Sequence, residues 1–172
     1  MQFKVKSALT ILAAATLVVA CGKKQEAVVP VESTAAPAAA PAPETMVVKI
    51  GHVGPTSGAI AHLGKDNENG ARMAVEELNA AGVVIDGKKV TIELMAEDDA
   101  ADPKQGTAVA QKLVDAKVSG VVGHLNSGTT IPASKIYSDA GIPQISPSAT
   151  NPLYTRQGFK TAFRLVADDT QL

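Results

Sequence analysis

The chain of 172 residues contains one cysteine, no tryptophan and only 3% aromatic residues. A single cysteine excludes an internal disulfide and any metal site built from several cysteines. Because aromatic residues are so few, we expect the core to consist mainly of Val, Ile, Leu and Ala. The length is that of one ordinary domain.

Neither sign of charge is in large excess. The 16 Lys and Arg against 17 Asp and Glu give a formal net charge of -1. A basic nucleic-acid surface and an acidic tail are therefore not indicated. We expect no nucleic-acid partner.

A short apolar run lies at the N-terminus, from Ala8 to Ala20. It is shorter than the roughly 20 residues that a membrane-spanning helix needs. Lys4 and Lys6 precede it and small residues end it, which predicts an export signal over residues 1–20. The run ends in LVVAC, which resembles the bacterial lipobox and predicts lipidation of Cys21, with membrane contact only through that lipid. The alternatives are a buried core cysteine or an ordinary cleaved signal.

The next stretch, KKQEAVVPVESTAAPAAAPAPET, contains four prolines among alanines. Proline interrupts the hydrogen bonding of helices and strands, so this stretch is predicted to be a semi-extended tether. Residues 21–45 then form the lipidated cysteine and tether, and residues 46–172 form the globular part.

Strand and helix patterns alternate in the globular part. Short apolar or alternating runs predict strands over 46–53, 88–99, 118–124, 142–146 and 160–167. Apolar helical faces with capping signals predict helices over 70–82, 102–117 and 127–141. Asp86-Gly87 predicts a turn after a short extended piece at 83–85. This order predicts an α/β fold with a parallel sheet and helices on both faces.

In such sheets ligands bind beyond the carboxyl ends of the strands. Three of the four expected loops there, 54–64, 125–130 and 146–152, are rich in Gly, Ser and Thr. Backbone N–H groups and hydroxyls around one cleft suit a small anion such as a carboxylate. The alternative is that these residues only cap helices.

Catalytic interpretations receive little support. The sequence around His124 and Ser127, GHLNSGT, differs from the G-x-S-x-G nucleophile elbow. Asp98 and Asp99 are neighbours in a strand and point to opposite faces, which weakens an acid/base pair or a metal site. No G-x-G-x-x-G follows the first strand. We expect no enzyme activity, no cofactor and no metal, and we assign His124 a packing role.

Three stretches carry a family resemblance: GKDNENGARMAVEELNAAG, AEDDAADPKQGTAVAQKLVDAKVSGVVGHLNSGTTIPAS and ISPSATNP. They resemble the periplasmic leucine/isoleucine/valine-binding proteins, the solute receptors of branched-chain amino acid ABC importers. The resemblance extends from about Val48 to Leu172. It implies a type I periplasmic binding fold whose two α/β lobes close on a ligand. From this resemblance we expect residues 46–172 to form the first part of lobe one, with the second lobe absent.

The resemblance also implies binding residues. Ser127 would hold the α-carboxylate of an amino acid through its hydroxyl and N–H. Thr150 would offer its N–H to the carboxylate and its hydroxyl to the α-ammonium, and Ser148 would offer a backbone carbonyl to the ammonium. Ala149 would line the same turn. Leu63 would face the aliphatic group of the substrate, where well-known members have an aromatic residue.

The chain departs from the family in two further respects. Well-known members join two loops by a disulfide, and Ala101 and Asn126 stand at those two positions here. The family's acidic partner for the ligand ammonium comes from the second lobe, so no residue of this chain is assigned that role. The function implied is a receptor on the periplasmic side of a bacterial membrane, delivering branched-chain or related amino acids to the permease subunits of an ABC importer. The alternatives are a ligand-sensing regulatory domain of the same fold and a truncated fragment that binds nothing. The lipid anchor and tether favour the importer.

Overall fold

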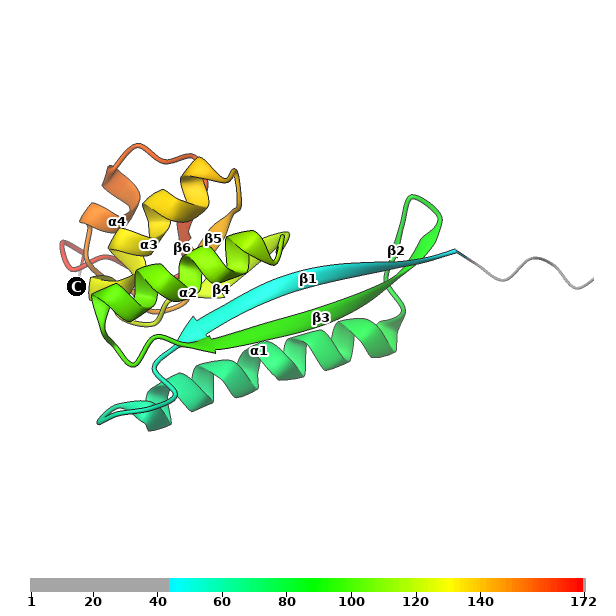
Figure 1. The fold of residues 1–172 in the computed structure, drawn as a ribbon, viewed down its shortest axis with the longest axis horizontal. Helices are drawn as coiled ribbons and strands as arrows, with labels where there is room; N and C mark the ends of the chain where they lie inside the picture. The colour runs from blue at the N-terminus through cyan, green and yellow to red at the C-terminus, as the bar shows by residue number, and fades with distance from the viewer. Residues whose placement is uncertain (1–43, 172) are drawn as a thin grey trace, which may run out of the picture. The chain divides into compact units, whose positions relative to one another are not determined.

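The structure, a computed structural model, describes residues 44–171, so the expected export signal, Cys21 and nearly all of the tether lie outside the described residues. Six strands form one sheet in the order β2-β3-β1-β4-β5-β6 (Figure 1). Their bounds are β1 Thr45–Gly54, β2 Val84–Ile85, β3 Lys88–Asp98, β4 Gly120–Gly123, β5 Gln144–Ser146 and β6 Ala162–Arg164. Every pairing is parallel except that of β2 with β3. The predicted parallel α/β sheet is confirmed.

The helices lie on both faces of this sheet, as predicted. They are α1 Ala61–Ala81, α2 Pro103–Asp115, α3 Ser127–Asp139 and the short α4 Leu153–Arg156. The long α1 runs along β1 and β3, whereas α2 and α3 pack against each other on the opposite face (Figure 1). Each of α1, α2 and α3 follows a parallel strand and leads back to the next parallel one, with the short β2 between α1 and β3.

Local signals explain where α1 ends and how it is attached. Gly82 has a left-handed φ of 73° and its N–H reaches the carbonyls of Leu78 and Asn79, which closes the helix. The Asn79 side chain then bonds the backbone of Ile92 in both directions, at 2.9 and 2.8 Å. These bonds satisfy backbone groups of β3 that no strand pairs with.

The start of α1 differs from the prediction. The helix begins at Ala61, well before the expected start at Gly70, so the end of the predicted loop 54–64 is helical. Gly64 makes this possible because its backbone lies directly against Pro55, where a Cβ atom would come within 2.1 Å of the Pro55 carbonyl oxygen. Gly64 was expected to be part of a loop, but it lies in the helix and allows the close contact with Pro55.

Two smaller elements also differ. Helix α4 follows β5 where no helix was expected, and β6 is shorter than the predicted strand 160–167. These segments are too short for periodicity to identify them.

The main core lies between the sheet and the pair α2 and α3. Its buried members are Val53, Val109, Ala110, Leu113, Val118, Val121, Ala133, Tyr137 and Ile142. All but Tyr137 are aliphatic, as the composition suggests. This core holds rigid the strand ends from which the loops of the candidate site emerge.

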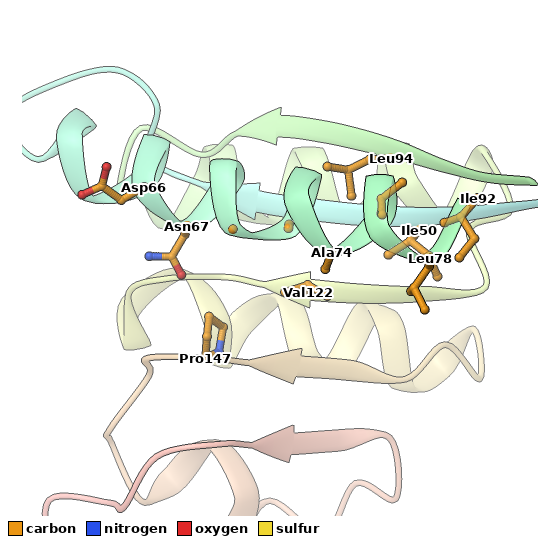
Figure 2. A pocket seen from close by; sticks show the side chains of 12 residues that line it. Ile50, Asp66, Asn67, Ala74, Leu78, Ile92, Leu94, Val122 and Pro147 are labelled. Atoms are coloured by element: carbon orange, nitrogen blue, oxygen red, sulfur yellow. The ribbon is translucent and has the colours of Figure 1, made fainter. Parts of the chain in front are cut away.

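The opposite face of the sheet is only partly covered. A groove of about 630 Å³ lies beside α1 (Figure 2). Its lining comprises Ile50, Asp66, Asn67, Gly70, Ala71, Ala74, Val75, Leu78, Ile92, Leu94, Val122 and Pro147. On the last strand Phe163 is 49% exposed, and Leu165 just beyond it is 75% exposed. Within residues 44–171 no helix is long and apolar enough to cross a membrane.

Candidate ligand-binding site

The loops of the candidate site meet at one edge of the sheet. Because β1, β3, β4 and β5 are parallel, their carboxyl ends share that edge, and the starts of α1 and α2 lie beside the ends of β1 and β3 (Figure 1). The groove beside α1 lies on the partly covered face of the sheet and includes Pro147 from one of these loops.

Asp98 joins the first two loops. One of its carboxylate oxygens accepts the N–H groups of Thr56 at 2.8 Å, Ser57 at 3.3 Å and Ala100 at 2.8 Å. Burial alone would raise the pKa of Asp98, but hydrogen bonds from Ser57, Ala100 and Thr56 outweigh it, so the pKa lies below its ordinary value. Asp98 is an ionised carboxylate that shapes the loops.

The third and fourth loops are also bonded to each other. The Ser148 hydroxyl donates to the Leu125 carbonyl at 2.9 Å, and the Asn151 N–H donates to the Ser127 hydroxyl oxygen at 3.2 Å. The structure thus brings together Ser127 and the turn that carries Ser148, Ala149 and Thr150. Among residues 44–171 the Ser127 hydroxyl donates to no protein atom, so its proton can serve a ligand.

The N-terminus of α3 is open. Asn126 is the N-cap, but its side chain makes no capping hydrogen bond, and its Oδ1 is buried without a partner among the described residues. The carbonyl of Asn126 accepts the N–H groups of Thr129 and Thr130, at 3.1 and 2.9 Å. The N–H groups of Ser127 and Gly128 precede these in the first turn, where a helix offers no internal acceptor. Such N–H groups and the helix dipole attract anions.

Hydrogen bonds from neighbouring residues hold the turn after β5 in place. Ser146 accepts the N–H of buried Ala149 at 3.0 Å, and the Thr150 carbonyl accepts the N–H of Asp169 at 2.9 Å. Arg164 donates to the Asn151 carbonyl at 3.1 Å. The Thr150 hydroxyl makes no hydrogen bond with another residue of the described part.

Leu63 lies apart from this cluster. It belongs to the first turn of α1, not to a loop as predicted, and its side chain is 43% exposed. That turn starts at the same edge of the sheet as the Ser127 loop. No hydrogen bond connects Leu63 with Ser127, Ser148 or Thr150.

His124 is packed beneath the loops. Its side chain is buried, and its ring nitrogens lie 2.9 Å from an Asp99 carboxylate oxygen and 3.2 Å from the Tyr137 hydroxyl. Asp98 and Asp99 do point different ways, one to the loop after β1 and the other to His124. Within the described residues no three His, Cys, Asp or Glu side chains are grouped as metal ligands.

The sequence did not predict the residues whose hydrogen bonds hold the loops in place, chiefly Asp98, Ser146 and Arg164. A local signal existed for Ser146, since a serine hydroxyl often accepts the backbone N–H of a residue two or three positions later. Arg164 had no local signal, because its partner carbonyl at Asn151 is set by tertiary packing.

The family model for periplasmic binding proteins matches residues 47–172. This chain belongs to the periplasmic binding protein family. A relative in Brucella abortus, the Leu/Ile/Val-binding protein homolog 1, is 47% identical over 117 residues, which are 68% of this chain and 31% of the relative. The chain thus spans about a third of the length of the curated relatives it matches.

Solved structures of the periplasmic binding protein family share the fold. The branched-chain amino acid transporter substrate binding protein LivJ of Streptococcus pneumoniae, in complex with isoleucine, superposes with a TM-score of 0.66 and 38% identity, over 73% of this chain and 35% of LivJ. A solute binding protein of an ABC transporter from R. palustris, in complex with benzoate, gives a TM-score of 0.63 and 27% identity, over 73% and 34% of the two chains. The expected type I periplasmic binding fold is confirmed.

Proposed function

We propose that this chain forms the N-terminal ligand-binding part of a receptor for branched-chain or related amino acids. The ligand carboxylate would lie at the start of α3, between the Ser127 hydroxyl and the N–H groups of Ser127 and Thr150. The single observation that carries the proposal is the open N-terminus of α3 with the unused Ser127 hydroxyl proton beside it. A carboxylate at this place would receive charge-assisted hydrogen bonds, which are stronger than neutral ones.

The ammonium group of the ligand would lie over the turn after β5. There the Thr150 hydroxyl and the Ser148 carbonyl would accept its protons, and Ala149 would hold the turn from its buried position. Leu63 would contact the aliphatic side chain. Isoleucine in the LivJ complex supports this choice of ligand class, whereas benzoate in the second complex shares only the carboxylate.

The cellular setting is also part of the proposal. An export signal at residues 1–20 and a lipid on Cys21 would place the receptor on the periplasmic side of a membrane, with residues 21–45 as the tether. The permease subunits of an ABC importer would be its partners. Its membership in the periplasmic binding protein family supports this location.

Residues 46–172 would be one part of a larger lobe in this setting. The groove beside α1 and the exposed Phe163 and Leu165 support this, since an apolar face of this kind calls for a cover. A ligand held on one side only would bind weakly, because a second lobe would supply much of the desolvation.

Saturation-transfer difference NMR tests the binding proposal, since it observes the ligand and tolerates weak affinity. L-leucine should show transfer from the chain and be displaced by L-isoleucine. L-leucinamide, which keeps the ammonium and side chain but lacks the carboxylate, should show none. Equal transfer to L-leucinamide would contradict the carboxylate site, as would unchanged transfer to L-leucine in Ser127→Ala.

A further inference from the structure

A buried polar chain lies directly beneath the two loops of the proposed site. Asp99 follows β3, His124 follows β4 and Tyr137 is in α3, and all three side chains are fully buried. The His124 ring joins the other two through Nδ1 to Asp99 at 2.9 Å and through Nε2 to Tyr137 at 3.2 Å. None of the three contacts solvent, so none can touch a ligand.

The protons of this chain have one consistent arrangement. Burial lowers the pKa of His124, and hydrogen bonds from His124 and Ala101 outweigh burial to lower the pKa of Asp99. Burial also raises the pKa of Tyr137, so the phenol stays protonated. Neutral His124 must then donate from Nδ1 to the Asp99 carboxylate and accept at Nε2 from the Tyr137 hydroxyl.

The backbone carbonyl of His124 is hydrogen-bonded to both loops of the proposed site. It accepts the hydroxyl of Ser146, at the end of β5, at 2.7 Å. It also shares the hydroxyl of Thr130 in α3, at 3.1 Å, with the Asn126 carbonyl at 2.8 Å. The oxygen of Ser146 in turn accepts the Ala149 N–H at 3.0 Å. One carbonyl therefore connects the start of α3 with the turn that carries Ser148 and Thr150.

We propose that Asp99, His124 and Tyr137 are positioning residues of the carboxylate site, acting through the carbonyl of His124. The side-chain bonds fix the ring, the ring fixes the peptide, and the carbonyl sets the spacing between the Ser127 and Thr150 loops. This inference rests on the function proposed above and extends it to residues that never meet the ligand.

A purely stabilising role explains this arrangement less well. Apolar residues of similar volume often replace buried ionic groups without loss of stability. A chain of directional hydrogen bonds instead restricts the position of each member, which a binding site requires. The two hydroxyls on one carbonyl come from two separate elements, so the restriction extends across the site.

The test compares two buried tyrosines. Tyr137→Phe removes the hydroxyl that fixes His124, and Tyr154→Phe removes a buried hydroxyl that bonds the Gln144 carbonyl at 3.0 Å instead. In hydrogen exchange of the 172-residue chain by mass spectrometry, Tyr137→Phe should accelerate exchange of the Ala149 N–H by about fivefold or more. Tyr154→Phe should change it by less than about twofold. Equal acceleration in both variants would overturn the proposal.

A second variant keeps the test informative if Tyr137→Phe does not fold. Thr130→Val keeps the shape of the side chain but removes the hydroxyl that the His124 and Asn126 carbonyls share, and it should accelerate exchange of the same N–H. In the unmodified chain, ¹⁵N spectra of histidine-labelled protein should show His124 with its proton on Nδ1. A proton on Nε2, or unchanged exchange in Thr130→Val, would contradict the proposal.

Ligand binding provides the last comparison. The apparent affinity for L-leucine should fall several-fold in Tyr137→Phe and change less than about twofold in Tyr154→Phe. If the unmodified chain does not bind L-leucine at all, the proposed function fails, whereas the exchange and ¹⁵N results still decide whether the chain positions the loops. Accelerated exchange with unchanged affinity in Tyr137→Phe would refute a positioning role.

Discussion

Helices α2 and α3 begin at the same edge of the sheet, have 13 residues each and lie against one another, yet their N-termini differ. In α2 the Asp102 carboxylate accepts the N–H groups of Lys104 at 2.9 Å and Gln105 at 2.8 Å. In α3 the Asn126 side chain caps nothing. The first turn of α2 is therefore capped by a carboxylate of the protein, whereas the first N–H groups of α3 can bind a ligand.

This difference separates a structural loop from a candidate binding loop. Both N-caps are residue types that commonly accept hydrogen bonds from the first turn. At α2 the Asp102 carboxylate accepts the N–H groups of Lys104 and Gln105, so neither of these backbone donors is left for a ligand carboxylate. At α3 the missing cap, the Ser127 hydroxyl and the adjoining Thr150 turn combine polar groups that the protein itself does not saturate.

The largest effect is expected when a carboxylate is placed at the N-cap of α3. Asn126→Asp should cap α3 and repel a ligand carboxylate, since like charges about 4 Å apart near a protein surface repel by roughly 4 kcal/mol. We expect the affinity for L-leucine to fall by more than about a hundredfold, measured by saturation transfer. Asn126→Ser, a neutral cap, is the control and should lose far less. Full binding by Asn126→Asp would place the carboxylate elsewhere.

Removing single hydroxyls should have the next largest effect. In a chain completed with a second lobe, Ser127→Ala and Thr150→Val should each weaken amino-acid binding about tenfold or more, because a hydrogen bond to a charged group contributes roughly 1.5–3 kcal/mol. Titration calorimetry with a panel of amino acids is the measurement. Thr107→Val, in α2, removes a hydroxyl that bonds only its own helix and serves as the control. Equal losses in the control and the two site variants would argue against the assignment.

Acid should destabilise the folded chain through its two buried histidines, His52 and His124. Burial lowers the pKa of both His52 and His124 in the folded chain. The unfolded chain therefore takes up protons as the pH falls through about 6.5 while the folded chain does not. The free energy of unfolding should decrease from pH 7 to pH 5, by up to about 1.4 kcal/mol per pH unit for each histidine.

Urea denaturation at several pH values measures this slope, and His52→Leu should reduce it. The ring nitrogens of His52 are buried without partners among the described residues, so leucine should cost little stability at neutral pH. An unchanged slope in His52→Leu would assign the acid sensitivity to other groups.

The smallest effect is expected at the start of α2. Asp102→Ala should lower the free energy of unfolding by about 1 kcal/mol, the usual cost of losing an N-cap. Binding of L-leucine should stay within about twofold of the unmodified chain. Denaturation and saturation transfer on the same sample measure both quantities. A large loss of binding would mean that the two helix starts act together.

The sequence predicts one of these helix starts better than the other. Asp102 followed by Pro103 indicates the capped start of α2, and the structure has it. Asn126 equally favours a cap by residue type, but its rotamer depends on what surrounds it in the folded chain. The missing side-chain cap of α3 therefore depends on tertiary structure and cannot be predicted from the local sequence.

The same division holds for the rest of the fold. Alternating strand and helix patterns predict the parallel sheet, because each pattern is local and strongly periodic. The early start of α1 depends on the approach of Gly64 to Pro55, and the fastening of the turn after β5 depends on Arg164. Both contacts depend on how the chain packs in three dimensions and on no local pattern, so only the assembled structure reveals them.

The long register of β1 has a mechanical consequence. β1 pairs in parallel with β3 over ten residues, from Thr45 opposite Lys89 to Gly54 opposite Asp98, and its second half also pairs with β4. A pulling force applied at Thr45 acts along the strand, so it loads these hydrogen bonds together in shear and does not peel them one at a time. Force reaching the domain through its N-terminal segment therefore meets the most resistant direction of the sheet.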